Sequence, residues 1–431
     1  MLRIVTTRFE AEQELRRIAN RTHADHATYQ ESSVREILLN VRRSGDEALL
    51  RYTLEFDGVA LSPGDLKVTP REIEQAYDRV SRDLLAALRQ ARKKIDAFHR
   101  QRIPKSWTVF EDNEVVLGQR FTPVDAAGLY IPGGQASYPS SVLMNVVPAK
   151  IAGVPRTVMC TPPGRDGQVS ASVLVAAHEA GVDEIYRIGG AQAIGALAYG
   201  TATVAKVDLI TGPGNIYVTL AKRLVFGEVG IDSLAGPSEV LIVADDSANP
   251  LWVATDLLAQ AEHDPLAAAI LLTPSTELAE QVNEALVRQL RSHSRRQLTE
   301  KSIANYGLVV ITEDLEEAAR LSNLFAPEHL ELQMRDPWAL IPAIRHAGAI
   351  FLGHHSPEAV GDYLAGPNHV LPTSGAARYS SALGVQTFLK SSSLIQYSRR
   401  ALQEVAADID ALTQAEGLPA HGDSVQVRLQ P

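Results

Sequence analysis

The sequence predicts an α/β protein with two domains built on parallel sheets and with small helical parts at both ends of the chain. From about residue 124 onward, short apolar runs alternate with helical stretches, which is typical of βα units. A second series of such runs begins at Glu239, after a break at 230–236. With 431 residues, of which 45% are hydrophobic, the chain is long enough to bury more than one core.

The first hundred residues show helical periodicity. One buried helix face, with i, i+3, i+4, i+7 spacing, is predicted for Val34, Ile37, Leu38 and Val41. A longer helical pattern begins at Pro70, which is favourable in a first helical turn, and continues to Phe98. We interpret the basic run 92–94 as the solvent-exposed face of this helix and not as a binding patch.

The strands are predicted from the apolar runs. The first series comprises 156–160, 184–188 and 207–210. The second series comprises 239–245, 267–272, 307–311 and 349–352. After about residue 380 the pattern becomes helical again, through 401–413.

Composition excludes several classes of function. Lys and Arg number 41 against 51 Asp and Glu, and a net charge of -10 disfavours nucleic acid as a partner. No apolar run reaches the roughly 20 residues that a membrane span needs, and we see no secretory signal. Cys160 is the only cysteine, so no intramolecular disulfide forms. We therefore expect a soluble, cytoplasmic protein that uses neither nucleic acid nor membrane.

The segment FAPEH (325–329) places two proton carriers side by side in an apolar stretch. His329 can accept a proton from a hydroxyl near neutral pH, and a partly desolvated Glu328 can be tuned toward the same range. Pro327 fixes the backbone at the entry to the pair. The alternative is a strand end with a solvated Glu328 and a His329 that only caps a core.

Gln260 and His263 are three residues apart, so on a helix they would project from one face as half of a metal site. Core packing explains most such pairs. Further ligands would come from distant loops, and the candidates are Asp362 and His421. This set of nitrogen and oxygen donors suits zinc or manganese.

Three glycine-containing turns each follow an apolar run and precede a helical one. They are IPGG (131–134), IGGAQ (188–192) and TGPGN (211–215). Such turns present backbone N–H groups and a helix N-terminus to a phosphate or dinucleotide, although none matches the G-x-G-x-x-G pattern. Each turn alone is also compatible with an ordinary strand-to-helix connection.

Two further features have simpler interpretations. Cys160 ends a predicted strand and could act as a thiolate nucleophile, but we interpret it as structural and inert. His354 and His355 could bind a metal, although their position after Gly353 favours solvated side chains.

Taken together, these segments resemble the histidinol dehydrogenase family over nearly the whole chain. The motifs that carry the resemblance are GLYIPGG (128–134), YPSSVLMN (138–145), GGAQAI (189–194), GPGN (212–215), AGPSE (235–239), QAEHD (260–264), FAPEH (325–329), GD (361–362) with NH (368–369), and EGLPAH (416–421).

The resemblance implies a zinc-dependent, four-electron dehydrogenase of histidine biosynthesis. It would oxidise L-histidinol through L-histidinaldehyde to L-histidine with two NAD. His329 would be the base of the first step, and Glu328 would activate water for the second. The resemblance places one zinc per subunit on Gln260, His263, Asp362 and His421, and NAD near Tyr130, Gln192 and Asn215. It places the substrate near Ser238, Gln260, His263, His329, Glu358, Asp362, His369, Glu416 and His421.

The resemblance also implies a fold similar to aldehyde dehydrogenases, with two incomplete Rossmann-like domains. We expect an N-terminal helical segment at 1–25, and a first α/β domain at 26–120 and 236–380 with the metal and catalytic residues. We expect an NAD-binding α/β domain at 121–235. A C-terminal helical tail at 381–431 would complete the site of the partner subunit in a homodimer. The alternative is a paralogous dehydrogenase that oxidises a sulfonated diol.

Overall fold

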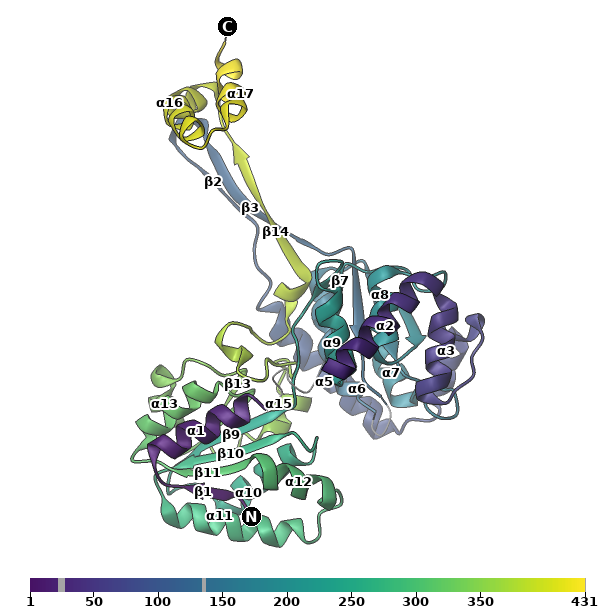
Figure 1. Ribbon diagram of the computed structural model, residues 1–431, viewed down its shortest axis with the longest axis vertical. Coiled ribbons are helices and arrows are strands. Elements are labelled where there is room, and N and C mark those ends of the chain that lie inside the picture. The colour runs from purple at the N-terminus through teal and green to yellow at the C-terminus, as the bar shows by residue number, and fades with distance from the viewer. Residues whose placement is uncertain (22–27, 134–136, 431) are drawn as a thin grey trace.

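The computed structural model describes residues 1–21, 28–133 and 137–430, and shows two α/β lobes from which a long arm projects (Figure 1). Each lobe contains a parallel sheet with helices packed on it, so the predicted α/β class is confirmed. Gly134 and the expected boundary at 25–26 lie outside the described residues. In the described parts of the chain, no helix combines the length and apolarity needed to cross a membrane.

The first lobe is built on a six-stranded parallel sheet with the order β1-β11-β10-β9-β12-β13. Its strands are β1 (Arg3–Val5), β9 (Glu239–Ala244), β10 (Ala268–Thr273), β11 (Gly307–Ile311), β12 (His329–Gln333) and β13 (Ala349–Leu352). Its helices are α1 (Arg8–Ala19), α10 (Pro250–Ala261), α11 (Thr276–Leu290), α12 (Arg296–Tyr306), α13 (Leu315–Phe325), α14 (Pro337–Leu340) and α15 (Glu358–Tyr363). Strands β9 and β10 are buried along their whole length, as expected for a sheet covered on both faces.

The second lobe is built on a five-stranded parallel sheet with the order β6-β5-β4-β7-β8. Its strands are β4 (Ala126–Tyr130), β5 (Arg156–Thr161), β6 (Glu184–Arg187), β7 (Leu209–Thr211) and β8 (Gly230–Ile231). The helices that connect them are α6 (Pro139–Ala152), α7 (Ala171–Ala180), α8 (Gly190–Tyr199) and α9 (Ile216–Val225). The order changes direction between β4 and β7, so this sheet has the topological switch point of a dinucleotide-binding fold.

The N-terminal part of the chain is divided between the lobes differently from the expectation. The expected helical segment 1–25 begins with a strand, because Arg3–Val5 pairs with Leu308, Val309 and Val310 at an open parallel edge of the first sheet. The expected grouping of 26–120 with 236–380 also differs from the packing. The helices α2 (Thr28–Ser44), α3 (Asp46–Asp57), α4 (Pro70–Tyr77) and α5 (Arg82–Arg100) pack on the second lobe.

A close contact between α2 and α8 explains this placement. The predicted buried face of α2, including Leu38 and Val41, belongs to the same core as Ile194 and Leu197 of α8. A Cβ added at Gly195 would lie 3.2 Å from Leu38 and 3.3 Å from Val41, so the glycine lets the two helices approach closely. The apolar face of α2 therefore finds its partner in the second lobe.

The arm is a three-stranded antiparallel ribbon that carries two helices at its end (Figure 1). The ribbon consists of β2 (Trp107–Phe110), β3 (Val116–Pro123) and β14 (Leu389–Gln396), and the helices are α16 (Arg399–Ala415) and α17 (Pro419–Leu429). Short 3-10 turns occur at Pro63–Asp65, Asp112–Glu114, Ile341–Ala343, Ala376–Arg378 and Val385–Phe388. The predicted helix through 401–413 is present as α16, but β14 carries it away from both sheets.

Candidate active site

Two central strands of the first sheet begin at the candidate catalytic residues. Helix α13 ends at Phe325 and is capped by Ala326, whose φ of 57° is the left-handed conformation that few residues other than glycine adopt, and Pro327 and Glu328 lead into β12. His329 is the first residue of β12 and is in register with Val240 on the neighbouring strand β9. The pair therefore lies at the amino ends of parallel strands, next to Glu239.

The backbone of Glu239 holds both candidate catalytic side chains. Its N–H donates to Glu328 Oε2 at 2.9 Å, and its carbonyl oxygen lies 3.0 Å from His329 Nδ1. A carbonyl can only accept, so Nδ1 carries the proton and Nε2 keeps its lone pair. Among the described residues, Nε2 has no hydrogen-bond partner. His329 is thus held in the tautomer that can act as a base through Nε2.

A group of carboxylates surrounds His329. Asp362 Oδ1 lies 4.0 Å from His329 Nε2, and Glu358 Oε1 lies 3.7 Å from Nδ1. These three residues offer ligand atoms within 4.8 Å of one another. Gln260 is fully buried beside them and, in the amide orientation that satisfies its neighbours, donates to Glu358 Oε2 at 2.9 Å. Nitrogen and oxygen donors in this arrangement fit a divalent metal of the zinc type.

Burial makes this cluster electrostatically unusual. Burial raises the pKa of Glu328 well above its ordinary value, and the charge of Glu239 raises it further. Burial, together with the neighbouring Asp362, likewise raises the pKa of Glu358, and burial raises the pKa of Asp362 to about 6. Crowded carboxyl groups away from water are stabilised by a cation, which can be a metal ion or an ammonium group.

The imidazoles of the site are held neutral. Burial lowers the pKa of His329 to about 3 and the pKa of His369 to about 4. A neutral imidazole is the form that accepts a proton, so His329 is ready to act as a base. His369 is fixed from both lobes, because its Nδ1 lies 3.0 Å from the carbonyl oxygen of Asp362 and its Nε2 lies 3.2 Å from Ser141 Oγ.

The remaining predicted substrate and metal residues fall into two groups. Ser238 directly precedes β9 and is partly buried, and His263 is exposed just beyond the end of α10, close enough to act electrostatically on Asp362. Glu416 and His421 are exposed and lie at the far end of the arm, at the end of α16 and in α17. Within one chain, the structure therefore does not bring Glu416 and His421 to the rest of the site (Figure 1).

The predicted cofactor residues lie at the carboxyl edge of the second sheet. Tyr130, the last residue of β4, accepts a hydrogen bond at its hydroxyl from Gly190 N–H at 3.1 Å. Gln192 is 1% exposed, and neither atom of its amide has a hydrogen-bond partner among the described residues. Asn215 caps helix α9, because its Oδ1 accepts from Tyr217 and Val218. A buried amide without partners at this edge fits a site that a polar ligand completes.

The turns of this edge require glycine for physical reasons. Gly212 has a φ of 114°, and a Cβ there would lie 2.0 Å from the carbonyl oxygen of Tyr130. A Cβ at Gly189 would lie 2.6 Å from Pro162. Glycine is therefore required where the backbone packs this closely, and the N–H groups of Gly190 and Gly212 donate to the Tyr130 hydroxyl and to Asp232 Oδ2, the latter at 2.8 Å.

A buried polar network behind the site was not predicted from the sequence. Gln333 Nε2 donates to Asp256 Oδ2 and to Glu331 Oε2, both at 2.7 Å, and Glu331 Oε1 accepts from Glu358 N–H at 2.9 Å. Burial, with a contribution from Asp256, raises the pKa of Glu331 to about 8. The alternation of polar His329, Glu331 and Gln333 along β12 is the signal that could have revealed it.

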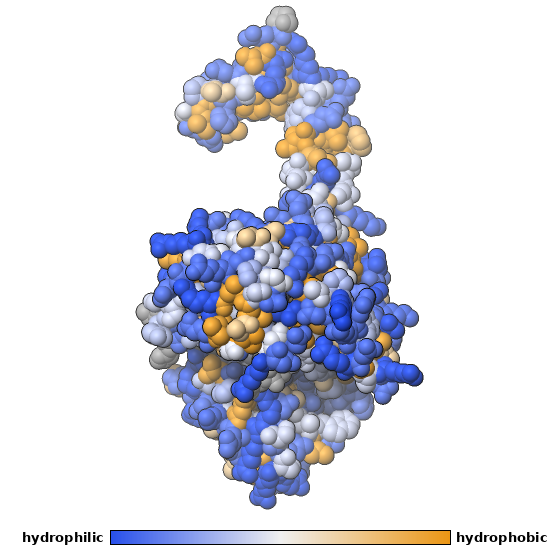
Figure 2. Space-filling model, turned by 90° about the vertical axis from the view of Figure 1, so that its right-hand side faces the viewer, coloured by the Kyte–Doolittle hydropathy of each residue, from blue (hydrophilic) through white to orange (hydrophobic). Residues whose placement is uncertain are grey.

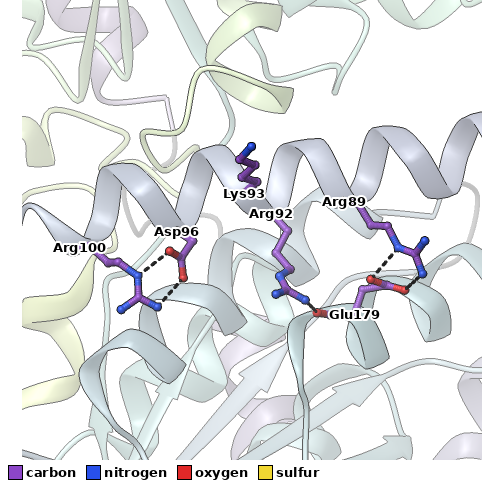
Figure 3. A pocket seen from close by; sticks show the side chains of 6 residues that line it. All are labelled: Arg89, Arg92, Lys93, Asp96, Arg100 and Glu179. Atoms are coloured by element: carbon purple, nitrogen blue, oxygen red, sulfur yellow. Dashed lines mark hydrogen bonds and ion pairs between the residues drawn. The ribbon is translucent and has the colours of Figure 1, made fainter.

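Three further features have no role in the proposed chemistry. A cavity of about 550 Å³ lies against α5, and both of its carboxylates are already paired, Glu179 with Arg89 and Asp96 with Arg100 (Figure 3). Its lining side chains are Arg89, Arg92, Lys93, Asp96, Arg100 and Glu179. Burial raises the pKa of the Cys160 thiol, which makes this cysteine unreactive. His354 contacts Ser247, and His355 packs beside Trp252.

Comparison with known proteins agrees with this arrangement. The histidinol dehydrogenase family model matches residues 19–429. The chain is 67% identical over 430 residues to the histidinol dehydrogenase of Gloeobacter violaceus, covering 100% of this chain and 97% of that relative. It is 61% identical over 431 residues to the histidinol dehydrogenase of Thermosynechococcus vestitus, with complete coverage of both chains.

A solved structure gives the same result. The crystal structure of histidinol dehydrogenase from Elizabethkingia anophelis superimposes with a TM-score of 0.93 at 35% sequence identity. The match covers 99% of this chain and 97% of that one. The chain therefore belongs to the histidinol dehydrogenase family, whose members are oxidoreductases.

Proposed function

We propose that this chain oxidises L-histidinol to L-histidine in two successive steps through L-histidinaldehyde, the last steps of histidine biosynthesis. The observation that carries the proposal is the pair Glu328 and His329, which one backbone residue, Glu239, orients together. Two proton acceptors at one point match a reaction with two oxidations and one addition of water. Family membership supplies the identity of the substrate.

The first oxidation needs a base for the hydroxyl proton. His329 Nε2 accepts this proton while the carbinol carbon gives up a hydride, and the product is the aldehyde. NAD, bound near Tyr130, Gln192 and Asn215, supplies the hydride acceptor in each of the two oxidations. The carbonyl of Glu239 stabilises the protonated imidazole that forms, because it accepts from Nδ1–H.

The second oxidation needs an activated water. Glu328 accepts a proton from water as the water oxygen bonds to the aldehyde carbon, and the carbonyl oxygen takes the proton that His329 accepted in the first oxidation, which gives the hydrated aldehyde. Loss of a second hydride and of one hydroxyl proton then gives the carboxylic acid. A glutamate with a raised pKa is a stronger base than an ordinary carboxylate, and a bound cation would favour its ionised form.

The charge of the site favours histidinol over the sulfonated diol. Glu358 is 6% exposed and Asp362 is largely buried, so an anionic sulfonate would meet two desolvated carboxyl groups. The ammonium group of histidinol would instead compensate them. We assign one zinc per subunit to Gln260, His263, Asp362 and, from a second copy of the chain, His421. Zinc would supply a fixed positive charge that orients the substrate's imidazole and amino nitrogens.

The arm supports a homodimer with shared active sites. Both outer strands of the ribbon are exposed along almost their whole length, and a ribbon without a covered face is marginal in water. Apolar side chains project from the arm (Figure 2); the most exposed are Phe110, Ile395, Leu412 and Val427. We infer that the arm packs on a second copy and delivers Glu416 and His421 to its site. The single, buried cysteine fits a cytoplasmic location.

The stoichiometry of NADH tests the reaction. We expect two NADH per L-histidinol consumed, with activity lost on chelation and restored by zinc. In Glu328→Gln, we expect the aldehyde to accumulate, because the second step slows by about a hundredfold while the first persists. One NADH per histidinol in the native enzyme would refute the two-step proposal. Turnover of the sulfonated diol but not of histidinol would favour the alternative.

Mixing of inactive variants tests the shared site. His329→Asn and His421→Ala dimers, unfolded and refolded together, should recover about a quarter of native activity, because half of the dimers are mixed and each mixed dimer has one intact site. Separately refolded variants are the control. If the mixture is no more active than they are, the arm does not act in a second copy.

A further inference from the structure

Arg21 is buried although it lies just beyond the end of α1, where basic side chains are usually solvated. Its guanidinium is 1% exposed. It donates to backbone carbonyl oxygens on both sides, at 2.8 Å to Ile18 and at 2.7 Å to Leu266. A buried arginine with its donors satisfied in this way is held in one geometry.

The remaining donors of Arg21 bind the segment that leads into β9. They reach the carbonyl oxygens of Pro237 at 3.0 Å and Ser238 at 3.4 Å. Arg21 Nη1 also forms a 2.9 Å ion pair with Glu239 Oε1, and the Glu239 side chain is fully buried. Three consecutive residues are thus fixed by one side chain.

Glu239 is the residue whose backbone orients Glu328 and His329. Its Oε1 also accepts from Ser374 N–H at 3.2 Å, so its side chain is tied to the 372–375 turn as well as to Arg21. A rotation of the peptide groups around Glu239 would move both the N–H that Glu328 accepts from and the carbonyl that His329 donates to. The Arg21–Glu239 pair therefore controls two side chains at once.

We propose that Arg21 is a positioning residue for both oxidations, acting through Glu239 and the 237–239 backbone. The inference rests on the proposed function, since that assigns the reaction to Glu328 and His329. A shift of about 1 Å in a catalytic group can lower a rate by about a hundredfold, and Glu239 alone stands between Arg21 and the two catalytic side chains. The effect of Arg21 should appear in kcat, because it touches neither substrate nor cofactor.

The test compares Arg21→Met, Arg21→Lys and Glu239→Gln with Arg17→Met. Arg17, in the last turn of α1, is a matched control, since both arginines lie over the ring of Tyr306, but Arg17 is half-exposed and contacts Glu14 and the carbonyl of Asn305. All variants are first checked for folding by circular dichroism and for zinc content. Arg21→Lys and Glu239→Gln keep the experiment informative if Arg21→Met does not fold.

We expect Arg21→Met to lower kcat for histidinol, and for histidinaldehyde supplied directly, by about a hundredfold each. Arg21→Lys should recover about tenfold of this loss, because an ammonium keeps the pair with Glu239 but cannot span the carbonyls as the planar guanidinium does. KM for NAD should stay within about twofold, because the cofactor turns lie on the other sheet. The double variant with Glu239→Gln should be no slower than Arg21→Met, since the pair acts as a unit.

Two results distinguish a failure of the proposed function from a failure of the inference about Arg21. If native enzyme forms no NADH from histidinol, the proposed function fails before any variant is compared. If native enzyme turns over normally and folded, zinc-loaded Arg21→Met and Arg21→Lys keep kcat within about threefold, Arg21 has only a structural role and the inference is wrong. An equal loss in Arg17→Met would also overturn it.

Discussion

The two parallel sheets contribute opposite edges to the site. The second sheet contributes the carboxyl ends of β4, β6 and β7, where the glycine turns lie and where the buried amide of Gln192 has no partner among the described residues. The first sheet contributes the amino ends of β9 and β12, where Glu239 and His329 are the first residues of their strands. Ligand binding at the carboxyl ends is the general rule for open α/β sheets, and only the second sheet follows it.

The two edges differ in the kind of chemical group that they carry. At the carboxyl edge the amide of Gln192 does not titrate, and Tyr130 remains neutral because burial raises its pKa to about 12. At the amino edge the groups are titratable side chains, and burial has moved their pKa values. We therefore expect changes at the amino edge to affect chemistry and stability with pH, and changes at the carboxyl edge to affect cofactor affinity.

The largest expected effect is the loss of the base at the amino edge. His329→Asn should lower kcat by about a thousandfold, equivalent to about 4 kcal/mol, because no other imidazole of the described residues offers a free nitrogen at that point. NAD affinity, measured by fluorescence titration, should change by less than about twofold. The matched control is His354→Asn at the opposite end of the same sheet, where the ring contacts Ser247.

Two outcomes of this experiment would contradict separate roles for the two edges. If His354→Asn loses as much activity as His329→Asn, the amino edge has no special role and both changes act through folding. If NAD affinity falls together with kcat in His329→Asn, the two edges are not separate functional units.

The sequence could predict the components of both edges, but it could not predict which strands lie side by side. Apolar runs indicated the parallel strands, and the local motifs indicated Glu328, His329, Gln260 and the glycine turns. Strand order and register were not accessible, because β9 and β12 are neighbours although about 90 residues separate them. The role of Glu239 depends on that pairing, so its backbone could not be recognised as the holder of the catalytic pair.

One prediction that differs from the structure and one residue that the sequence analysis missed have the same origin. Residues 28–100 carry clear helical patterns, but an amphipathic stripe does not specify which sheet covers it, and these helices belong to the second lobe. In the sequence, Arg21 is an ordinary basic residue at a helix end, and only its burial against 237–239 reveals a role. Long-range contacts decide both cases, and local sequence carries little information about them.

The second largest effect concerns stability and pH at the amino edge. Burial raises the pKa of Asp362 from 3.8 to about 6 in the folded chain. As pH falls, the folded state therefore binds this proton at a higher pH than the unfolded state does, and proton binding stabilises the fold. This stabilisation is lost as pH rises through about 6. In chelated protein at pH 8, Asp362→Asn should be more stable than native protein by up to about 3 kcal/mol, and the difference should vanish below about pH 4.

Urea unfolding of both proteins in chelator across this pH range measures the effect. Asp246→Asn is the control, because Asp246 lies at the carboxyl edge of the same sheet and its side chain is 78% exposed. This control should track native protein at every pH. A difference between Asp362→Asn and native protein that does not depend on pH would show that the amino-edge carboxyl is not held in an unfavourable charged state.

The smallest effect is expected at the carboxyl edge, from Gln192→Leu. Leucine has a similar size and removes two buried amide atoms that lack partners among the described residues, each of which costs about 1–3 kcal/mol, so the ligand-free variant should be more stable than native protein. The same change should raise KM for NAD about tenfold, or about 1.4 kcal/mol, while kcat at saturating NAD stays within about twofold. Thermal unfolding without ligand measures the change in stability, and initial rates against NAD concentration measure the change in KM. Gln281→Leu, at an exposed position on α11, is the control.

Higher stability together with a higher KM for NAD would identify Gln192 as a group that serves cofactor binding at the expense of stability. Lower stability with unchanged KM would instead make it a packing residue, and Gln192 would no longer be a candidate contact for NAD.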